Sequence, residues 1–431
     1  MKKIIGYIFI LSVLIIPLRS YAGTPDSALV GQYFKELQNL IMQDHGQFWG
    51  LSLDGPVFCI DPLSRQLLAN CQSAHSTFRP EGDLFAGNLP PGPSSANSIM
   101  DFEGENWTMV MWPLPADYHK RMEIMIHESF HRIQKYLGFR MGNPMVPYLD
   151  KKNGRIWFRL EANALYKAVQ GRDAEMIRAL KHALYFRYRR FKENPDPGKA
   201  EMRIETNEGL AQYTGYHVAY HNAKEKQVGY FRDLMDLLGN TPSFVRSSAY
   251  FTGAMYGELF DRLDPGWNRE LSDSADFFSL GMKLTGTNTE ILSDLNDKEF
   301  REEYGYAKIV GEETARQEIA DKKLLEYRNK FLGKNAFTIH FTSLHIGFSP
   351  SNLVNLDDTG TVYPNCNVSD DFGILTVTNG ALLFNDWKSM NIAPPQSVTD
   401  TLAQGDGWEL RLNKGWRVRK NERMEYQLER N

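Results

Sequence analysis

The segment between residues 117 and 136 constrains this chain more than any other feature. Its apolar residues recur at helical spacing, Asp117 stands where a helix cap is expected, and Gly138 follows as a stop signal. The sequence from His127 to His131 reads H-E-S-F-H, so both imidazoles project from one helical face, one turn apart. We therefore predict a helix that can present two ligands to a single metal ion.

The glutamate between these histidines is a candidate general base beside the metal ion. A catalytic zinc ion uses three protein ligands and keeps one position open for water. A carboxylate beside the ion can take a proton from that water as the water attacks a carbonyl group. We expect one Zn²⁺, held by His127 and His131, with Glu128 as the general base.

Two glutamates on other predicted helices are candidates for the third ligand. Glu208 lies in the sequence N-E-G-L-A-Q-Y, within a helix predicted for residues 201–221. Glu161 is closer to His131 in the chain, on a predicted helix with an apolar face. The remaining glutamate is then expected to orient a histidine or to be a solvated charge, and Glu205 is a further candidate for orienting a histidine.

The segment around Glu208 resembles the N-E-G-x-A-x-Y stretch of gluzincin zinc peptidases, the peptidase MA group that includes aminopeptidases. The resemblance implies a zincin-like catalytic domain, a metallopeptidase activity and Glu208 as the third zinc ligand. The 77 residues from His131 to Glu208 exceed the spacing in those aminopeptidases, and an inserted helical hairpin near residues 140–200 would account for the difference. Their G-x-M-E-N signature is absent, which argues against aminopeptidase activity, and the sequence does not decide between endopeptidase and exopeptidase cleavage.

Two further segments are similar to parts of the same group. The sequence Y-F-T-G-A beginning at Tyr250 is similar to the Y-x-K-G-A segment, whose tyrosine hydrogen-bonds the developing oxyanion, although Thr252 replaces the lysine. The resemblance gives Tyr250 that role, and a fixed hydroxyl near the metal suits it. The β-favouring residues 105–112 correspond to an edge strand to which substrate peptides add by backbone pairing.

The sequence predicts an α+β fold with a signal and three regions. Residues 1–22 have the layout of a secretory signal peptide, with Lys2 and Lys3 before an apolar run. Residues 23–116 form a mixed α/β region with the active-site edge strand, and residues 117–334 form the helical catalytic domain. Within it we predict helices at residues 156–170, 174–192, 201–221 and 244–263. Residues 335–431 form a small β-rich domain, with strands at 337–341, 373–377, 408–412 and 416–418.

Export and charge limit the partners that we expect. The signal predicts a secreted or periplasmic protein, and no later stretch approaches the roughly 20 apolar residues of a membrane helix. The net charge is −4, which argues against a general nucleic-acid binder. The expected partner is a peptide or protein substrate, and the oligomeric state stays open.

The cysteines and a basic run complete the expectations. Of three cysteines, Cys59 and Cys71 flank a turn-bearing segment and are predicted to form a disulfide, while Cys366 is predicted to be a buried, inert thiol. The basic residues between Arg187 and Lys192 are predicted to form a solvated helix face.

Two functions from different classes are compatible with these features. The first is the exported zinc metallopeptidase, with amide hydrolysis at the motif helix. The second is an exported binding protein on a zincin scaffold, in which the metal site is structural or vestigial. The intact H-E-x-x-H pattern favours the enzyme, because a protein that has lost activity has no physical need for Glu128.

Overall fold

The computed structural model describes residues 24–62, 64–89, 96–142, 144–194, 198–273, 276–348, 353–356, 358–422 and 424–430. The predicted export signal lies outside the described residues. The fold is α+β, and the chain divides into one compact unit that ends at Val310 and another that begins at Gly311. The predicted boundary at residue 116 falls inside the first unit. The sheet and the helices on the two sides of this boundary share one hydrophobic core.

The first unit contains a six-stranded sheet that packs one face on the helices. Its order is β3 (Arg79–Glu81), β4 (Leu84–Asn88), β2 (Gln66–Ala69), β1 (Val57–Ile60), β6 (Glu105–Met111) and β5 (Ser98–Phe102). Successive side chains in a strand alternate between faces. One face contributes to the helical core and the other forms a smaller aromatic core with Phe58, Trp107 and Met109.

The strand that precedes the motif helix is not an edge strand, so that part of the prediction is wrong. β6 pairs in parallel with β1, placing Thr108 opposite Val57, and antiparallel with β5, placing Met109 opposite Ser98. β5 folds back onto it because Glu103 and Gly104 both take positive φ angles, 56° and 85°, in the connecting turn. β5 therefore occupies the edge beside β6.

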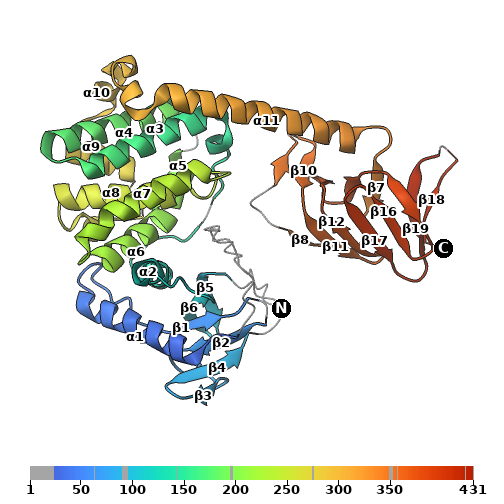
Figure 1. Cartoon of the computed structure of the whole chain (residues 1–431), viewed down its shortest axis with the longest axis horizontal. Coiled ribbons are helices and arrows are strands. Elements are labelled where there is room, and N and C mark those ends of the chain that lie inside the picture. Colours follow the sequence, from blue (N-terminus) through green and yellow to red (C-terminus); the bar gives the residue numbers. More distant parts are fainter. Residues whose placement is uncertain are drawn as a thin grey trace. The chain divides into compact units, whose positions relative to one another are not determined.

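The motif helix α2 (Tyr118–Gln134) packs against the sheet on one side and against α6 on the other. Asp117 caps α2 by accepting a hydrogen bond from the Lys120 backbone at 3.0 Å, as predicted. α2 lies between the sheet and α6 (Figure 1). The other helices are α1 (Ser27–Asp44), α3 (Lys152–Gln170), α4 (Asp173–Glu193), α5 (Gly198–Ile204), α6 (Leu210–Tyr220), α7 (Lys224–Asn240), α8 (Ser248–Leu263), α9 (Phe277–Thr285) and α10 (Thr289–Asp294). Short 3₁₀ turns cover Pro147–Asp150, Trp267–Glu270, Asp297–Glu299 and Arg301–Tyr304.

The helix predicted for residues 201–221 contains a wider turn in its middle. α5 continues into a π-helical segment, Glu205–Gly209, and then into α6. In this segment the Leu210 N–H bonds the Glu205 carbonyl, five residues back. The backbone of α8 lies so close that a Cβ atom added to Gly253 would be 2.4 Å from the Gly209 oxygen. Single π turns inside α-helices occur frequently at functional sites.

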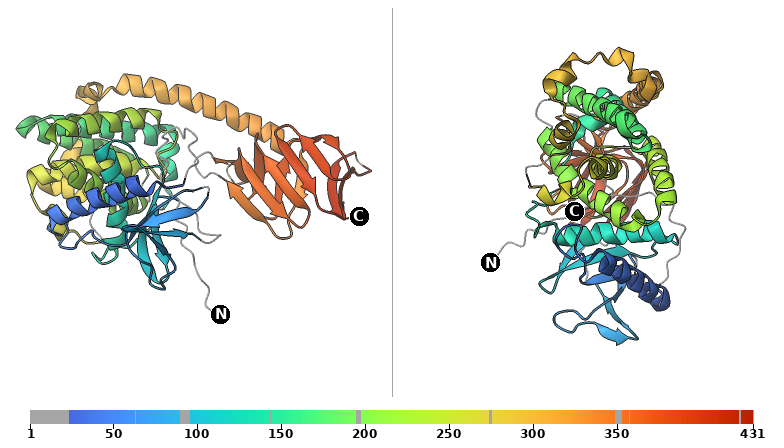
Figure 2. Two further views of the ribbon diagram at one scale, coloured as in Figure 1. Left: turned by 60° about the horizontal axis from the view of Figure 1, so that its bottom comes forward. Right: turned by 90° about the vertical axis from the view of Figure 1, so that its left-hand side faces the viewer.

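The second unit contains the greater part of α11 (Tyr306–Leu332) and the β-sandwich that follows this helix in the chain (Figure 2). Both sheets contribute side chains to one core, and every pairing between its strands is antiparallel. The first sheet has the order β7 (Phe337–His340), β14 (Ser389–Ile392), β13 (Ala381–Phe384), β10 (Gly360–Tyr363) and β9 (Val354–Asn355). The second has the order β15 (Pro395–Val398), β16 (Leu402–Gly405), β17 (Trp408–Leu412), β12 (Gly373–Val377), β11 (Cys366–Asp370) and β8 (His345–Phe348). β18 (Trp416–Lys420) and β19 (Tyr426–Arg430) form a separate hairpin.

The predicted disulfide between Cys59 and Cys71 is wrong, since all three cysteines are free thiols. Cys59 points into the helical core, whereas Cys71 packs against the aromatic core on the other face of the sheet. Side chains on opposite faces of a sheet cannot approach to bonding distance. Cys366 is buried as predicted. Among the described residues, no helix has the length and apolar character needed to cross a membrane.

Candidate metal centre

Two buried imidazoles of α2 face each other across a short gap. His127 and His131 are each 5 % exposed, and their Nε2 atoms lie 3.1 Å apart. Both residues stand on the side of α2 that packs against α6, because the apolar residues of α2 direct that face inward. The local pattern in the sequence therefore places both imidazoles as predicted.

Glu208 of the π-helical segment completes a triangle with the two histidines. Its Oε2 atom lies 3.5 Å from Nε2 of His127 and 3.4 Å from Nε2 of His131, and the residue is 2 % exposed. A tetrahedral ion with bonds of about 2.0–2.1 Å separates its ligand atoms by roughly 3.3 Å. The three donor atoms therefore have the spacing of three corners of a zinc-sized tetrahedron.

The carboxylate of Glu128 supports the same assignment of the site. Glu128 forms a buried group with the two histidines, in which the donor atoms lie within 4.8 Å of one another, and such a group can bind a metal ion. Its Oε2 atom is buried and has no hydrogen-bond partner within the described part of the chain. A buried carboxylate oxygen without a donor is costly, so it indicates a partner such as a water molecule held beside the ion.

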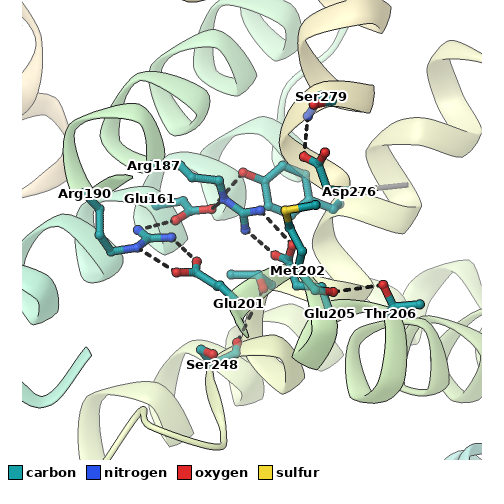
Figure 3. A network of polar contacts seen from close by, with 12 residues as sticks. Glu161, Arg187, Arg190, Glu201, Met202, Glu205, Thr206, Ser248, Asp276 and Ser279 are labelled. Carbon is teal, nitrogen blue, oxygen red and sulfur yellow. Dashed lines mark hydrogen bonds and ion pairs between the residues drawn. The ribbon is translucent and has the colours of Figure 1, made fainter. Parts of the chain in front are cut away.

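The alternative ligand, Glu161, belongs to a separate ionic cluster (Figure 3). It accepts hydrogen bonds from Arg187 at 2.7 Å and from the Tyr256 hydroxyl at 2.8 Å, and Arg190 lies 2.6 Å from its second oxygen. Two guanidinium groups therefore already neutralise this carboxylate. Among our two candidates, only Glu208 lies beside the histidines.

The same cluster shows that the predicted solvated basic face is wrong for Arg187 and Arg190, whereas Arg189 is partly exposed and Lys192 is exposed. Arg187 and Arg190 are only 1 % and 0 % exposed, because α4 packs against α3 and their guanidinium groups pair with carboxylates of α3, α5 and the π segment. Arg187 also donates to Glu205 at 2.9 Å, and Arg190 pairs with Glu201. Glu205, which we considered as an orienting partner of a histidine, instead binds this arginine. The local sequence identifies the basic residues but not their partners, which are on other helices.

Two glutamines surround the histidines, and our sequence prediction missed both. Gln134 accepts a hydrogen bond from Nδ1 of His131 at 2.7 Å, and the side chain of Gln212 interacts with His127. The sequence could have indicated Gln134, because it follows His131 by three residues on the same helix and therefore lies on the same face. Amides beside metal-binding histidines orient the rings without adding negative charge.

Burial and mutual charges shift the pKa values in the site. Burial raises the pKa of Glu128 to about 8, and the charge of Glu208 adds to this rise. Burial lowers the pKa of His127, whereas at His131 the charge of Glu208 overcomes the effect of burial and raises the pKa to about 9. The two histidines in turn hold the pKa of Glu208 well below its usual range, against the effect of burial.

Tyr250, at the start of α8, reaches the same group. Its ring stacks on the His127 ring, with centroids 5.6 Å apart and planes within 7°, and its hydroxyl donates to Glu208. α8 comes this close because Gly253 and Gly209 allow their backbones to touch. The structure therefore brings together all five residues that we singled out from the sequence: His127, Glu128, His131, Glu208 and Tyr250.

Comparisons with known proteins leave this site without a relative. No protein-family model, no curated protein and no solved structure matches the chain.

Proposed function

We propose that this protein is an exported zinc metallopeptidase of the gluzincin type, with a zincin-like catalytic domain. The observation that supports it is the triangle of Nε2, Nε2 and Oε2 atoms at 3.1, 3.4 and 3.5 Å, which joins the H-E-x-x-H helix to the N-E-G segment. Two nitrogen ligands and one carboxylate oxygen are the ligand set of many catalytic zinc sites in peptidases. In this proposal His127, His131 and Glu208 hold one Zn²⁺, and Glu161 has no part in binding it.

Each residue of the site has one task in the proposed reaction. The bound ion supplies positive charge that acidifies water and polarises the substrate carbonyl. Glu128 accepts the proton of the attacking water on Oε2 and delivers it to the departing amine nitrogen. With a divalent cation held by His127, His131 and Glu208, Glu128 would be ionised, as a base requires near neutral pH. The hydroxyl of Tyr250 donates to the oxygen on which negative charge grows.

The edge of the sheet suggests how a substrate is held. Among the described residues, β5 pairs on one side only, with β6, and both strands pack against the motif helix. An extended peptide can add to such an edge through backbone hydrogen bonds. The proposed substrate is therefore an extended segment of a peptide or protein, bound along β5 rather than along β6.

Metal content and a single substitution test the proposal. Purified protein should contain close to one zinc per chain and should cleave unfolded protein substrates in a chelator-sensitive manner. Glu128→Gln should keep the metal and lose the cleavage, because the amide cannot accept the proton. Cleavage by the variant at the parent rate would refute the mechanism. Metal retention without any cleavage by the parent would instead favour the binding protein with a structural metal site.

A further inference from the structure

Gln134 is fully buried, and every polar atom of its side chain has a partner. Its amide nitrogen donates to the carbonyl oxygens of Thr206 and Asn207 at 3.0 and 2.8 Å. Its amide oxygen lies 2.7 Å from Nδ1 of His131. The residue is 0 % exposed, so no solvent competes for these contacts. This one side chain thus touches both the second histidine of the motif and the turn that bears Glu208.

The two carbonyl contacts determine the orientation of the amide. Backbone carbonyls can only accept hydrogen bonds, so the atom of Gln134 that faces them must be the NH₂ group. Its oxygen must then face His131, where it can only accept. Nδ1 of His131 must therefore carry a proton and donate it. The other ring nitrogen, Nε2, is left to present its lone pair to a cation shared with His127 and Glu208.

We propose that Gln134 is the positioning residue of the metal site, which fixes the ring and tautomer of His131 and couples it to the π-helical turn that carries Glu208. This inference rests on the proposed function and deepens it. Without Gln134, the ring of His131 can rotate or present the wrong nitrogen. The two carbonyls of the π turn also lose their donor, and Glu208 loses its fixed distance from the histidines.

The pair of variants Gln134→Met and Gln134→Glu separates these roles. Methionine keeps the length and volume of the side chain but removes all three hydrogen bonds. Glutamate keeps an acceptor toward Nδ1 of His131 and removes the NH₂ group that faces the carbonyls. Ser129→Ala is the matched control, because Ser129 is buried on the same helix and its hydroxyl, among the described residues, bonds only the Met125 carbonyl of that helix.

Zinc affinity is the main readout, measured by competition with a chromophoric chelator. Loss of such an orienting partner typically costs about 10–100-fold in metal affinity. We expect a loss of that size in Gln134→Met, a partial recovery in Gln134→Glu and parent affinity in Ser129→Ala. Parent affinity in Gln134→Met, or an equal loss in the Ser129→Ala control, would overturn the inference.

A second measurement uses the parent protein and does not depend on any variant folding. In the zinc-loaded protein, nitrogen-correlated NMR of the histidine rings should show His131 protonated at Nδ1, with the proton protected from exchange by Gln134. A His131 ring protonated at Nε2 would overturn the inference while leaving the metal site in place. Absence of zinc binding by the parent would refute the proposed function instead, so the two failures are distinguishable.

Discussion

Replacing Arg187 by methionine should destabilise the protein strongly, because it removes a buried positive charge shared by two carboxylates. Arg187 is 1 % exposed and donates to Glu161 at 2.7 Å and to Glu205 at 2.9 Å. Glu161 keeps Arg190 and Tyr256 in the variant, whereas the ion pair of Glu205 with Arg187 is lost. Breaking a buried ion pair by removing one partner costs about 3–5 kcal/mol. We expect a loss of that order in the free energy of unfolding.

Urea denaturation of the metal-free protein, followed by tryptophan fluorescence, measures this loss. Lys35→Met is the control, because it removes a cation whose ion pair with Asp83 at 3.1 Å is exposed on both sides. Exposed pairs contribute about 0–1 kcal/mol. A loss below about 1 kcal/mol in Arg187→Met would refute the reasoning, since a solvated arginine would behave in that way.

The loss should also depend on pH, and the sign follows from Glu205. Burial already raises the pKa of Glu205 to about 7 in the parent, despite the opposing charge of Arg187. Without the guanidinium group the pKa rises further, so the folded variant holds a proton that the unfolded chain releases above about pH 4.5. A group with a raised folded pKa stabilises at low pH and loses that contribution as pH rises. The difference in the free energy of unfolding between variant and parent should therefore be smaller at pH 5 than at pH 8.

Three further outcomes are expected around the metal centre. Gly253→Ala places a methyl group about 2.4 Å from the Gly209 oxygen, so unfolding studies should show a loss of about 1–3 kcal/mol, and zinc titration should show weaker binding. Zinc affinity should rise with pH up to about 9, because His131, whose pKa is raised, must release a proton before it can bind the ion. Chelator competition at several pH values measures this dependence, and a constant affinity would contradict it. Tyr250→Phe keeps the ring that stacks on His127 but removes the hydroxyl that donates to Glu208, so kcat of the zinc-saturated variant should fall about 10²–10³-fold. Unchanged kcat would remove Tyr250 from the mechanism.

The parts of the fold that were predicted correctly depend on short-range patterns. The cap at Asp117, the helical hairpin at residues 156–192 and the four strands predicted at residues 337–341, 373–377, 408–412 and 416–418 each follow from spacing within a few residues. The site residues of α2 are predictable for the same reason, since four residues make about one helical turn. The N-E-G motif identified Glu208 only through a resemblance, and the structure places its carboxylate beside both imidazoles.

The features that were missed depend on partners far away in the chain. The strand β5 follows a segment rich in proline and serine. Because β5 pairs with β6, β6 is an internal strand of the sheet and not an edge strand. The separation of Cys59 from Cys71 follows from which face of the sheet each one meets. The burial of Arg187 depends on carboxylates from α3 and from the π segment, which no local pattern reveals.

The sequence by itself determined that two imidazoles and a glutamate stand on one helix at the spacing that a metal ion needs, because helical geometry fixes the separation of residues four apart. Which of the two candidate glutamates lies beside the imidazoles was decided only by the tertiary structure. Glu161 and Glu208 are chemically identical groups on helices, and they differ in what packs against them. Buried arginines neutralise Glu161, whereas the π turn, with Gln134 bonded to its carbonyls, presents Glu208 to the histidines.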